Sequence, residues 1–348
     1  LIESGTPLKH YIGFEISGKV HLGTGLVCMQ KVKDLVDAGV EVSILLADWH
    51  GWINDKLDGT LETANKMARS YFEEGLKAGY LCLGGNPDDI KFIVGSTLYS
   101  EKPNEYWATV IKVSKATTIS RMLRSTDIMG RQAGESSNAA TLIYPAMQSA
   151  DIFTLGVNIA HAGTDQRNVH VVARDSAKQA GFGKPVAIHH HLLQGLMRPD
   201  VGESEDKEAL KVALKMSKSK PDSAVFIHDS PDEIRRKVNN AFCPEGEVEF
   251  NPILDWCKYL IFYQLASQGE TLRIQREQKW GGDLEYTSYE DLEKDYAEKK
   301  LHPQDLKKAV AEWLIIKLEP ARKYFEDPKR KTALEEIEKL TKNPINVK

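Results

Sequence analysis

Residues 11–25 constrain the fold of this chain more than any other stretch. They read YIGFEISGKVHLGTG, an apolar run interrupted by glycines and one serine. Apolar residues then recur three or four positions apart, as on one face of a helix: Leu22, Leu26, Met29, Val32 and Val36. This pattern predicts a strand, a tight glycine turn and a helix whose first amides face the turn. Such a helix end favours a bound phosphate, and His21 would add a donor beside it. An ordinary strand-to-helix turn is the alternative, because short glycine motifs often occur by chance.

Beyond this stretch, strand-like and helix-like segments alternate. Residues 42–48 read VSILLAD, a mostly apolar run typical of a strand buried on both faces. Apolar side chains recur at helical spacing over residues 64–76. Further strands are expected at residues 91–94, 156–160 and 184–189, and further helices at residues 146–155 and from residue 165. The alternation predicts an α/β fold, a Rossmann-like doubly wound parallel sheet that binds ligands at the carboxyl ends of its strands.

Two regions depart from this alternation. Residues 98–140 are helical and charged, and we interpret them as an insertion between the two halves of the sheet. After residue 227 the sequence is helical, beginning with Ser230 and Pro231, where a capping box carries proline at the first helical position. We therefore expect a Rossmann-like domain over residues 1–227 and an all-α domain over residues 228–348.

Composition excludes several classes of protein. The net charge of −4, with 28% charged and 41% hydrophobic residues, indicates a soluble globular protein that does not coat nucleic acid along its whole surface. The sequence has no run of about 18 apolar residues, so no membrane span is expected. The 4 cysteines are scattered, which argues against a zinc site or a disulfide framework and suits a reducing cytoplasm. Residues 189–191 are all histidine, but consecutive strand positions point in different directions, so we expect no metal site there.

A second motif changes the interpretation of the first. Residues 215–221 read KMSKSKP, and lysines between small serines ahead of a proline indicate a mobile cationic loop, unless they form only a solvated surface. Together, the His-x-Gly turn at residues 21–23 and this lysine loop at residues 215–220 resemble the two ATP-binding motifs of class I aminoacyl-tRNA synthetases. The residues around them, YIGFE at 11–15, YPAMQ at 144–148 and DQR at 165–167, resemble tyrosyl-tRNA synthetases of the archaeal and eukaryotic type. The resemblance runs from about residue 11 to about residue 323.

Polar residues at positions 144, 148 and 151 would share one helix face among apolar neighbours. This pattern favours either a cavity or a hydrogen-bonded structural cluster. The resemblance implies a cavity that binds L-tyrosine. The side chains that would bracket the substrate hydroxyl are Tyr11 and Asp151. Those at its ammonium group would be Tyr144, Gln148, Gln166 and Glu15.

The implied first reaction is attack by the tyrosine carboxylate on the α-phosphate of ATP. The carboxylate is already a nucleophile, so catalysis would depend on positioning and on neutralising phosphate charge, with Mg²⁺ as a partner. By resemblance, that role belongs to His21, Gly23 with its neighbouring amides, Lys215, Ser217 and Lys218. The first motif departs from the family at its end, where Thr24 or Gly25 stands in place of a second histidine.

The implied second reaction passes tyrosine to tRNA(Tyr). By resemblance, Arg124 and Arg167 would contact the first acceptor base pair, and Trp280 and Asp305 would meet the anticodon. Residues 228–348 would then be an anticodon-binding domain, and residues 98–140 would carry a homodimer interface. For Trp280, a place in the hydrophobic core is the structural alternative.

Three other functions compete with this interpretation. A tryptophanyl-tRNA synthetase would share the fold, although Tyr11 and Asp151 favour a phenol over an indole. A small nucleotidyltransferase could carry a related His-x-Gly motif, but such enzymes are usually shorter and lack the helical C-terminal region. A catalytically inactive RNA-binding relative is less consistent with the intact lysines of the 215–220 loop.

Overall fold

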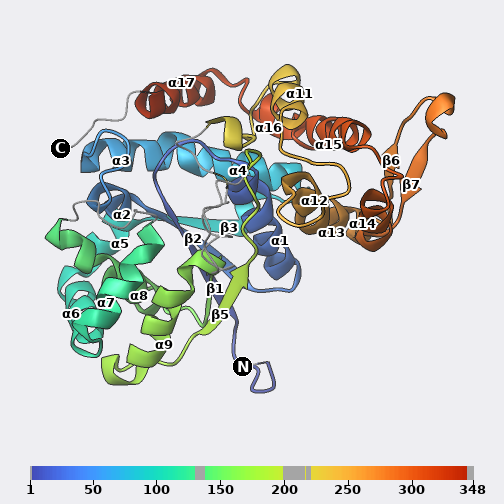
Figure 1. Ribbon diagram of the computed structural model, residues 1–348. Helices are drawn as coiled ribbons and strands as arrows, with labels where there is room; N and C mark the ends of the chain where they lie inside the picture. Colours follow the sequence, from blue (N-terminus) through green and yellow to red (C-terminus); the bar gives the residue numbers. More distant parts are fainter. Residues whose placement is uncertain (1, 130–137, 199–215, 217–220, 343–348) are drawn as a thin grey trace.

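A computed structural model describes residues 2–129, 138–198, 216 and 221–342 (Figure 1). Its centre is a five-stranded parallel sheet with the strand order β3-β2-β1-β4-β5. The strands are β1 (Lys9–Glu15), β2 (Glu41–Ala47), β3 (Ile90–Val94), β4 (Ile159–Gly163) and β5 (Val186–His190). The order reverses direction between β1 and β4, and the carboxyl ends of these two strands are where a doubly wound sheet binds its ligand. The predicted fold class is confirmed.

Side-chain alternation along the strands produces a core on each face of the sheet. On β1, Tyr11 belongs to one apolar cluster and Ile12 to the other, and Leu45 and Ile44 divide in the same way on β2. The helices of the first face are α1 (Met29–Asp37), α3 (Leu61–Met67) and α4 (Glu73–Cys82). The helices of the second face are α8 (Tyr144–Thr154) and α9 (Arg167–Ala180). A short helix α2 (Asp48–Ile53) follows β2 directly.

The helices predicted from periodicity are present. Over residues 64–76 the apolar positions are buried, and a π-helical turn, Ala68–Phe72, joins α3 to α4. The fourth strand lies three residues later than the predicted 156–160, because Gly156, with φ of 64°, first ends α8 in the left-handed conformation. The helical insertion contains α5 (Gly95–Glu101), α6 (Pro103–Lys115) and α7 (Ile119–Ser125).

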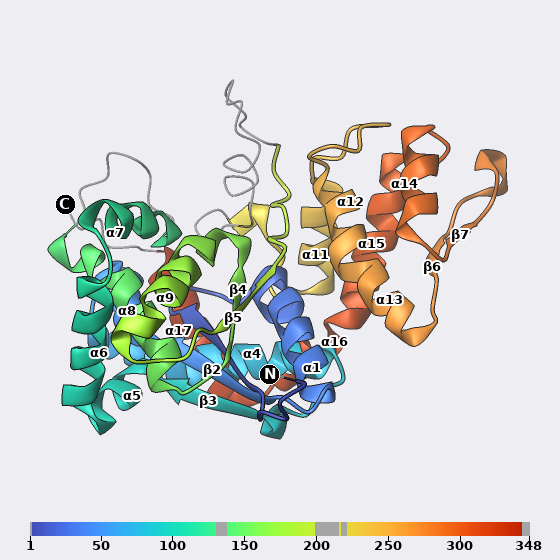
Figure 2. The same cartoon turned by 90° about the horizontal axis from the view of Figure 1, so that it is seen from below.

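The C-terminal region is helical, with one correction to the all-α prediction. It contains α11 (Pro231–Asn239), α12 (Pro252–Trp256), α13 (Phe262–Gln268), α14 (Tyr289–Ala297), α15 (Pro303–Lys317), α16 (Glu319–Tyr324) and α17 (Pro328–Lys342). Between α13 and α14, β6 (Leu272–Ile274) and β7 (Leu284–Tyr286) pair as an antiparallel hairpin. Each strand has only three residues, too few to produce a clear alternating pattern in the sequence. Figure 2 shows this hairpin projecting at the far end of the helical region from the five-stranded sheet.

Candidate active site

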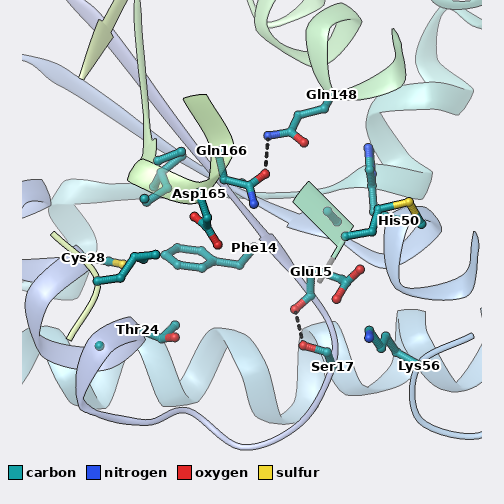
Figure 3. Close-up of a pocket in the computed structure, with 18 of the residues that line it drawn as sticks. Phe14, Glu15, Ser17, Thr24, Cys28, His50, Lys56, Gln148, Asp165 and Gln166 are labelled. Atoms are coloured by element: carbon teal, nitrogen blue, oxygen red, sulfur yellow. Dashed lines mark hydrogen bonds between the residues drawn. The ribbon is translucent and has the colours of Figure 1, made fainter. Parts of the chain in front are cut away.

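A cavity of about 630 Å³ lies at the carboxyl ends of the central strands (Figure 3). Strand β1 contributes side chains along its length, and α8 presents one helical face to the cavity. The lining includes all eight described residues of the predicted amino-acid and ATP sites: Tyr11, Glu15, His21, Gly23, Tyr144, Gln148, Asp151 and Gln166. The structure thus brings these eight residues together around one cavity. They come from segments up to about 150 positions apart in the sequence.

Asp151 is a fully buried carboxyl group with one oxygen occupied and one free. The Tyr106 hydroxyl donates to its Oδ1 at 2.9 Å. Its Oδ2 has no hydrogen-bond partner among the described residues, and His50 Nε2 lies 3.8 Å away. Burial raises the pKa of Asp151 to about 8, although the hydroxyls of Tyr106 and Tyr99 oppose that shift. An unpaired buried oxygen is costly, so this position is suited to a ligand that donates a hydrogen bond.

Tyr11 is buried in the same part of the cavity. Its hydroxyl lies over the backbone of Gly13, where an added Cβ would come within 2.5 Å of the Tyr11 oxygen. Burial raises the pKa of Tyr11, and the nearby Asp151 raises it further. The phenol is therefore a neutral hydrogen-bonding group that feels the charge of Asp151.

The remaining predicted substrate residues form a second, more polar part of the cavity. The Tyr144 hydroxyl donates to Glu15 Oε1 at 3.4 Å, and Asn54 Nδ2 donates to the same oxygen at 2.7 Å. Gln148 Nε2 donates to Gln166 Oε1 at 3.3 Å (Figure 3). Carboxylate and amide oxygens gathered in this way can accept hydrogen bonds from an ammonium group.

Residues 17–23, which we call the glycine turn, connect β1 to the first helix. The helix begins with a π-helical turn, Gly23–Cys28, that continues into α1. A Cβ at Gly23 would lie 3.1 Å from the His21 ring, so a side chain there would press on the imidazole. Thr24, which stands where the family pattern often has a second histidine, contacts His21 through its hydroxyl, 3.4 Å from Nε2. Thr24 thus supports the first histidine.

The segment after the lysine motif holds the glycine turn from the other side. Leu22 N donates to Val225 O at 3.0 Å, and Ile227 N donates to Val20 O at 3.1 Å. Met216 lines the cavity, and its amide donates to Leu193 O at 3.2 Å. The other predicted residues of this motif, Lys215, Ser217 and Lys218, lie outside the described residues.

Sequence reasoning missed His50 and Lys56, which line the cavity, and Tyr106, which contacts Asp151 without being part of the lining. Tyr106 and His50 reach Asp151 from α6 and α2, and no spacing in the sequence connects those helices to α8. Lys56 lines the cavity from a turn in which Asp55 and Leu57 have φ of 51° and 59°. Left-handed non-glycine residues cluster at functional sites, so this turn is notable beside a cavity. In the sequence, this turn is marked by the stretch NDKLDG at residues 54–59, which is polar or glycine apart from Leu57.

The predicted RNA contacts do not line the cavity. Arg124 on α7 and Arg167 at the start of α9 are both exposed, and Asp305 is in the first turn of α15. Trp280 is 67% exposed beside the β6–β7 hairpin, so the alternative of a core tryptophan is wrong.

The three consecutive histidines diverge as predicted. His189 contacts His170 on α9, His190 contacts His161 on β4, and His191 contacts Asp255 on α12. Over the described ranges, no three histidine, cysteine or acidic side chains are grouped to hold a metal ion. Those ranges also contain no helix with the length and apolar character needed to cross a membrane.

Comparison with known proteins gives consistent results. A family model described as tRNA synthetases class I (W and Y) matches residues 3–319. The tyrosine–tRNA ligase of Thermococcus kodakarensis is 54% identical over 338 residues, covering 94% of this chain and 89% of that protein. The crystal structure of Pyrococcus horikoshii tyrosyl-tRNA synthetase complexed with L-tyrosine matches with a TM-score of 0.91 at 50% identity, covering 97% of this chain and 93% of that one. A Leishmania major tyrosyl-tRNA synthetase in complex with tyrosinol matches at 0.84 and 28% identity, covering 99% of this chain and 50% of that one.

These matches decide between the competing interpretations. The family model includes enzymes for both tryptophan and tyrosine, but the relatives that match this chain at about half identity over nearly its whole length are tyrosine enzymes. A tryptophanyl synthetase and a nucleotidyltransferase unrelated to tRNA are therefore excluded. The fold, the cavity and the matches lead to one conclusion: the chain belongs to the tyrosine–tRNA ligases, within the class I aminoacyl-tRNA synthetases.

Proposed function

We propose that this cavity binds L-tyrosine and ATP, forms tyrosyl-adenylate, and delivers tyrosine to tRNA(Tyr). The observation that carries this assignment is the free oxygen of Asp151, a fully buried carboxyl group. A phenol would supply the missing donor, whereas an apolar ring would leave the oxygen unpaired. Tyr11 would take the other side of the substrate hydroxyl.

The rest of the cavity fits the other end of the amino acid. Glu15, Tyr144, Gln148 and Gln166 would hold the ammonium group, because each has a side-chain oxygen that can accept a hydrogen bond and all four line the cavity. The tyrosine carboxylate would then face the glycine turn.

Adenylation would proceed by in-line displacement. A carboxylate oxygen of tyrosine forms a bond to the α-phosphorus, the bond from that phosphorus to the bridging oxygen breaks, and pyrophosphate leaves. His21, the amide of Gly23 and the cationic side chain of Lys56 would stabilise negative charge on the phosphates, since all three residues line the cavity. Lys215, Ser217 and Lys218 would contribute from the 215–220 loop. Mg²⁺ would supply further charge neutralisation when it is bound with ATP.

Transfer to RNA would use surfaces away from the cavity. Arg124 and Arg167, both exposed, would contact the acceptor stem. The exposed Trp280 would stack on an anticodon base, and Asp305 would accept a hydrogen bond from an anticodon base. We therefore propose a catalytic domain over residues 1–227 and an anticodon-binding domain over residues 228–348.

A homodimer formed by the 98–140 insertion is part of the proposal. Three large apolar side chains on its helices are exposed to solvent, Ile111 by 57%, Ile119 by 76% and Leu123 by 52%. Exposed apolar side chains gathered on neighbouring helices are typical of an interface. The 4 cysteines are buried and form no disulfide, which suits a protein of the reducing cytoplasm.

ATP–pyrophosphate exchange tests the assignment of the cavity. Wild-type protein should exchange only with tyrosine among the amino acids, and His21→Ala should lower the rate constant with little loss of fold, because the imidazole is partly exposed. If His21→Ala left exchange unchanged, the glycine turn would not be the phosphate site.

A further inference from the structure

Helix α17 lies apart from most of the C-terminal helices that precede it. It lies over α3, on the same side as the Rossmann-like part of the molecule, while α12–α14 lie at the other end (Figure 1). Its apolar side is covered there: Ala333 and Ile337 are buried, and the helix packs on the π-helical turn Ala68–Phe72.

Three side chains along α17 form ion pairs with residues of the proposed catalytic domain, residues 1–227. Arg330 Nε lies 2.6 Å from Glu74 Oε2. Glu336 Oε1 lies 2.5 Å from Lys66 Nζ. Glu338 Oε1 lies 3.1 Å from Lys19 Nζ. The first two partners are on α4 and α3, but Lys19 is part of the glycine turn.

The last turn of α17 also reaches the substrate cavity. Leu340 and Thr341 belong to its lining, together with the glycine turn residues His21 and Gly23. The C-terminal helix therefore forms part of the wall of a site whose other lining residues lie between positions 11 and 216.

Lys19 connects this helix to the glycine turn. Lys19 follows Gly18, whose φ of 142° lies in a region that favours glycine. The conformation of the turn at this point therefore depends on that glycine. The Lys19 ammonium lies 4.3 Å from the centre of the Phe226 ring, and Phe226 forms a β-bridge with His21. The side chain of Lys19 is only 18% exposed and that of Glu338 34% exposed, so water screens the pair incompletely.

We propose that α17 forms part of the active site. Its residue Glu338, acting through Lys19, is a positioning residue for the glycine turn. This inference depends on the proposed role of that turn in binding ATP. Because Tyr11 and Asp151 lie on β1 and α8, outside the glycine turn, loss of Glu338 affects the nucleotide step and leaves tyrosine recognition intact.

A matched pair of substitutions tests the proposal. Glu338→Gln and Glu336→Gln each neutralise one partly exposed carboxylate on the same helix, and only the first contacts the glycine turn. In pyrophosphate exchange, Glu338→Gln should raise KM for ATP or lower kcat by about two- to fivefold, the range expected from one partly exposed ion pair. KM for tyrosine should stay the same in both variants, and Glu336→Gln should match the wild type in every parameter.

Exchanging the charges of Lys19 and Glu338 tests the proposal independently. Lys19→Glu and Glu338→Lys should each impair the ATP-dependent parameters, and the double variant should recover most of the loss in either single variant. Melting temperatures measured on each variant confirm that the folded protein is being assayed. The proposal is overturned if Glu338→Gln equals the wild type, if Glu336→Gln produces the same loss, or if the double variant shows no recovery.

The same assay separates this proposal from the assignment of the cavity. If His21→Ala abolishes exchange while Glu338→Gln has no effect, the site assignment stands and α17 is only a structural support. If His21→Ala has no effect, the assignment of the glycine turn fails, and the role of Glu338 fails with it.

Discussion

Replacing Asp151 should remove discrimination between tyrosine and phenylalanine. Its Oδ2 is buried and lacks a partner among the described residues, so tyrosine supplies a hydrogen bond that phenylalanine cannot. When Asp151 is ionised, a hydrogen bond to its charged oxygen contributes about 1.5–3 kcal/mol, and an acceptor left unpaired in a buried site costs about 1–3 kcal/mol. Together these terms favour tyrosine by about 2.5–6 kcal/mol, or roughly 10²- to 10⁴-fold in kcat/KM. Rejection of phenylalanine by tyrosyl synthetases is the standard illustration of this rule.

The assay is pyrophosphate exchange with each amino acid, using Asp151→Ala and Asp151→Asn. For tyrosine, kcat/KM should fall sharply in both variants, and for phenylalanine it should change little or rise. Asn keeps the size of the side chain, so a difference between the two variants separates the effect of charge from that of an internal hole. Tyr106→Phe is the control, because it removes the partner of Oδ1 and leaves Oδ2 in place. A variant that loses activity with both substrates while its selectivity ratio stays at the wild-type value would refute the reasoning.

The raised pKa of Asp151 adds a pH dependence to this prediction. With a folded-state pKa of about 8, the carboxyl group ionises as the pH rises from 7 to 9. Phenylalanine then leaves a charged oxygen unpaired, which costs more than leaving a neutral one. The tyrosine-to-phenylalanine ratio of kcat/KM should therefore increase across this interval, and a constant ratio would contradict the assignment.

Three other outcomes are expected. Lys56→Ala should lower the adenylation rate constant, measured in single turnovers, by about tenfold and leave the KM for tyrosine unchanged, because it removes one cation near the phosphates of ATP. An effect confined to tyrosine binding would show that Lys56 does not act on the phosphates. Arg124→Ala and Arg167→Ala should impair tRNA charging and leave pyrophosphate exchange intact, and a parallel loss in both assays would assign them to the cavity or an interface. Finally, the free energy of unfolding should fall between pH 6.5 and pH 4 in urea titrations. Burial lowers the pKa of several histidines to about 3 or 4, so over this range the unfolded chain binds protons that the folded chain does not, each contributing up to about 1.4 kcal/mol per pH unit. A flat profile would show that these imidazoles are protonated in the folded state. Asp151 contributes with the opposite sign, since its pKa is raised.

The parts of the fold that could be predicted are those specified locally. The apolar face over residues 64–76 and the buried run of β2 each carry a complete periodic pattern within one segment. The hydroxyl of Ser230 accepts from Glu233 N at 3.2 Å, so the predicted helix start is confirmed. The position of β4 was missed by three residues because the stretch after α8 stays apolar through the left-handed Gly156 and into the strand.

The substrate residues could be predicted only because a family pattern identifies them. Helical spacing placed Tyr144, Gln148 and Asp151 on one face, but it could not show whether that face borders a cavity or a structural cluster. Contacts between distant segments leave no local pattern at all. The Tyr106 hydroxyl on Asp151 and the ion pair between Lys19 and Glu338 join positions 45 and 319 residues apart, so only the structure reveals them.

The central claim is that one cavity holds the tyrosine phenol at Asp151 and the adenylate at the glycine turn. A crystal structure with a non-hydrolysable tyrosyl-adenylate analogue tests it most directly. The phenol oxygen should lie within hydrogen-bonding distance of Asp151 Oδ2 and the Tyr11 hydroxyl, about 2.5–3.2 Å. The group replacing the α-phosphate should lie beside His21 and the Gly23 amide. An analogue bound in the reverse direction, or with its phenol away from Asp151, would contradict the account.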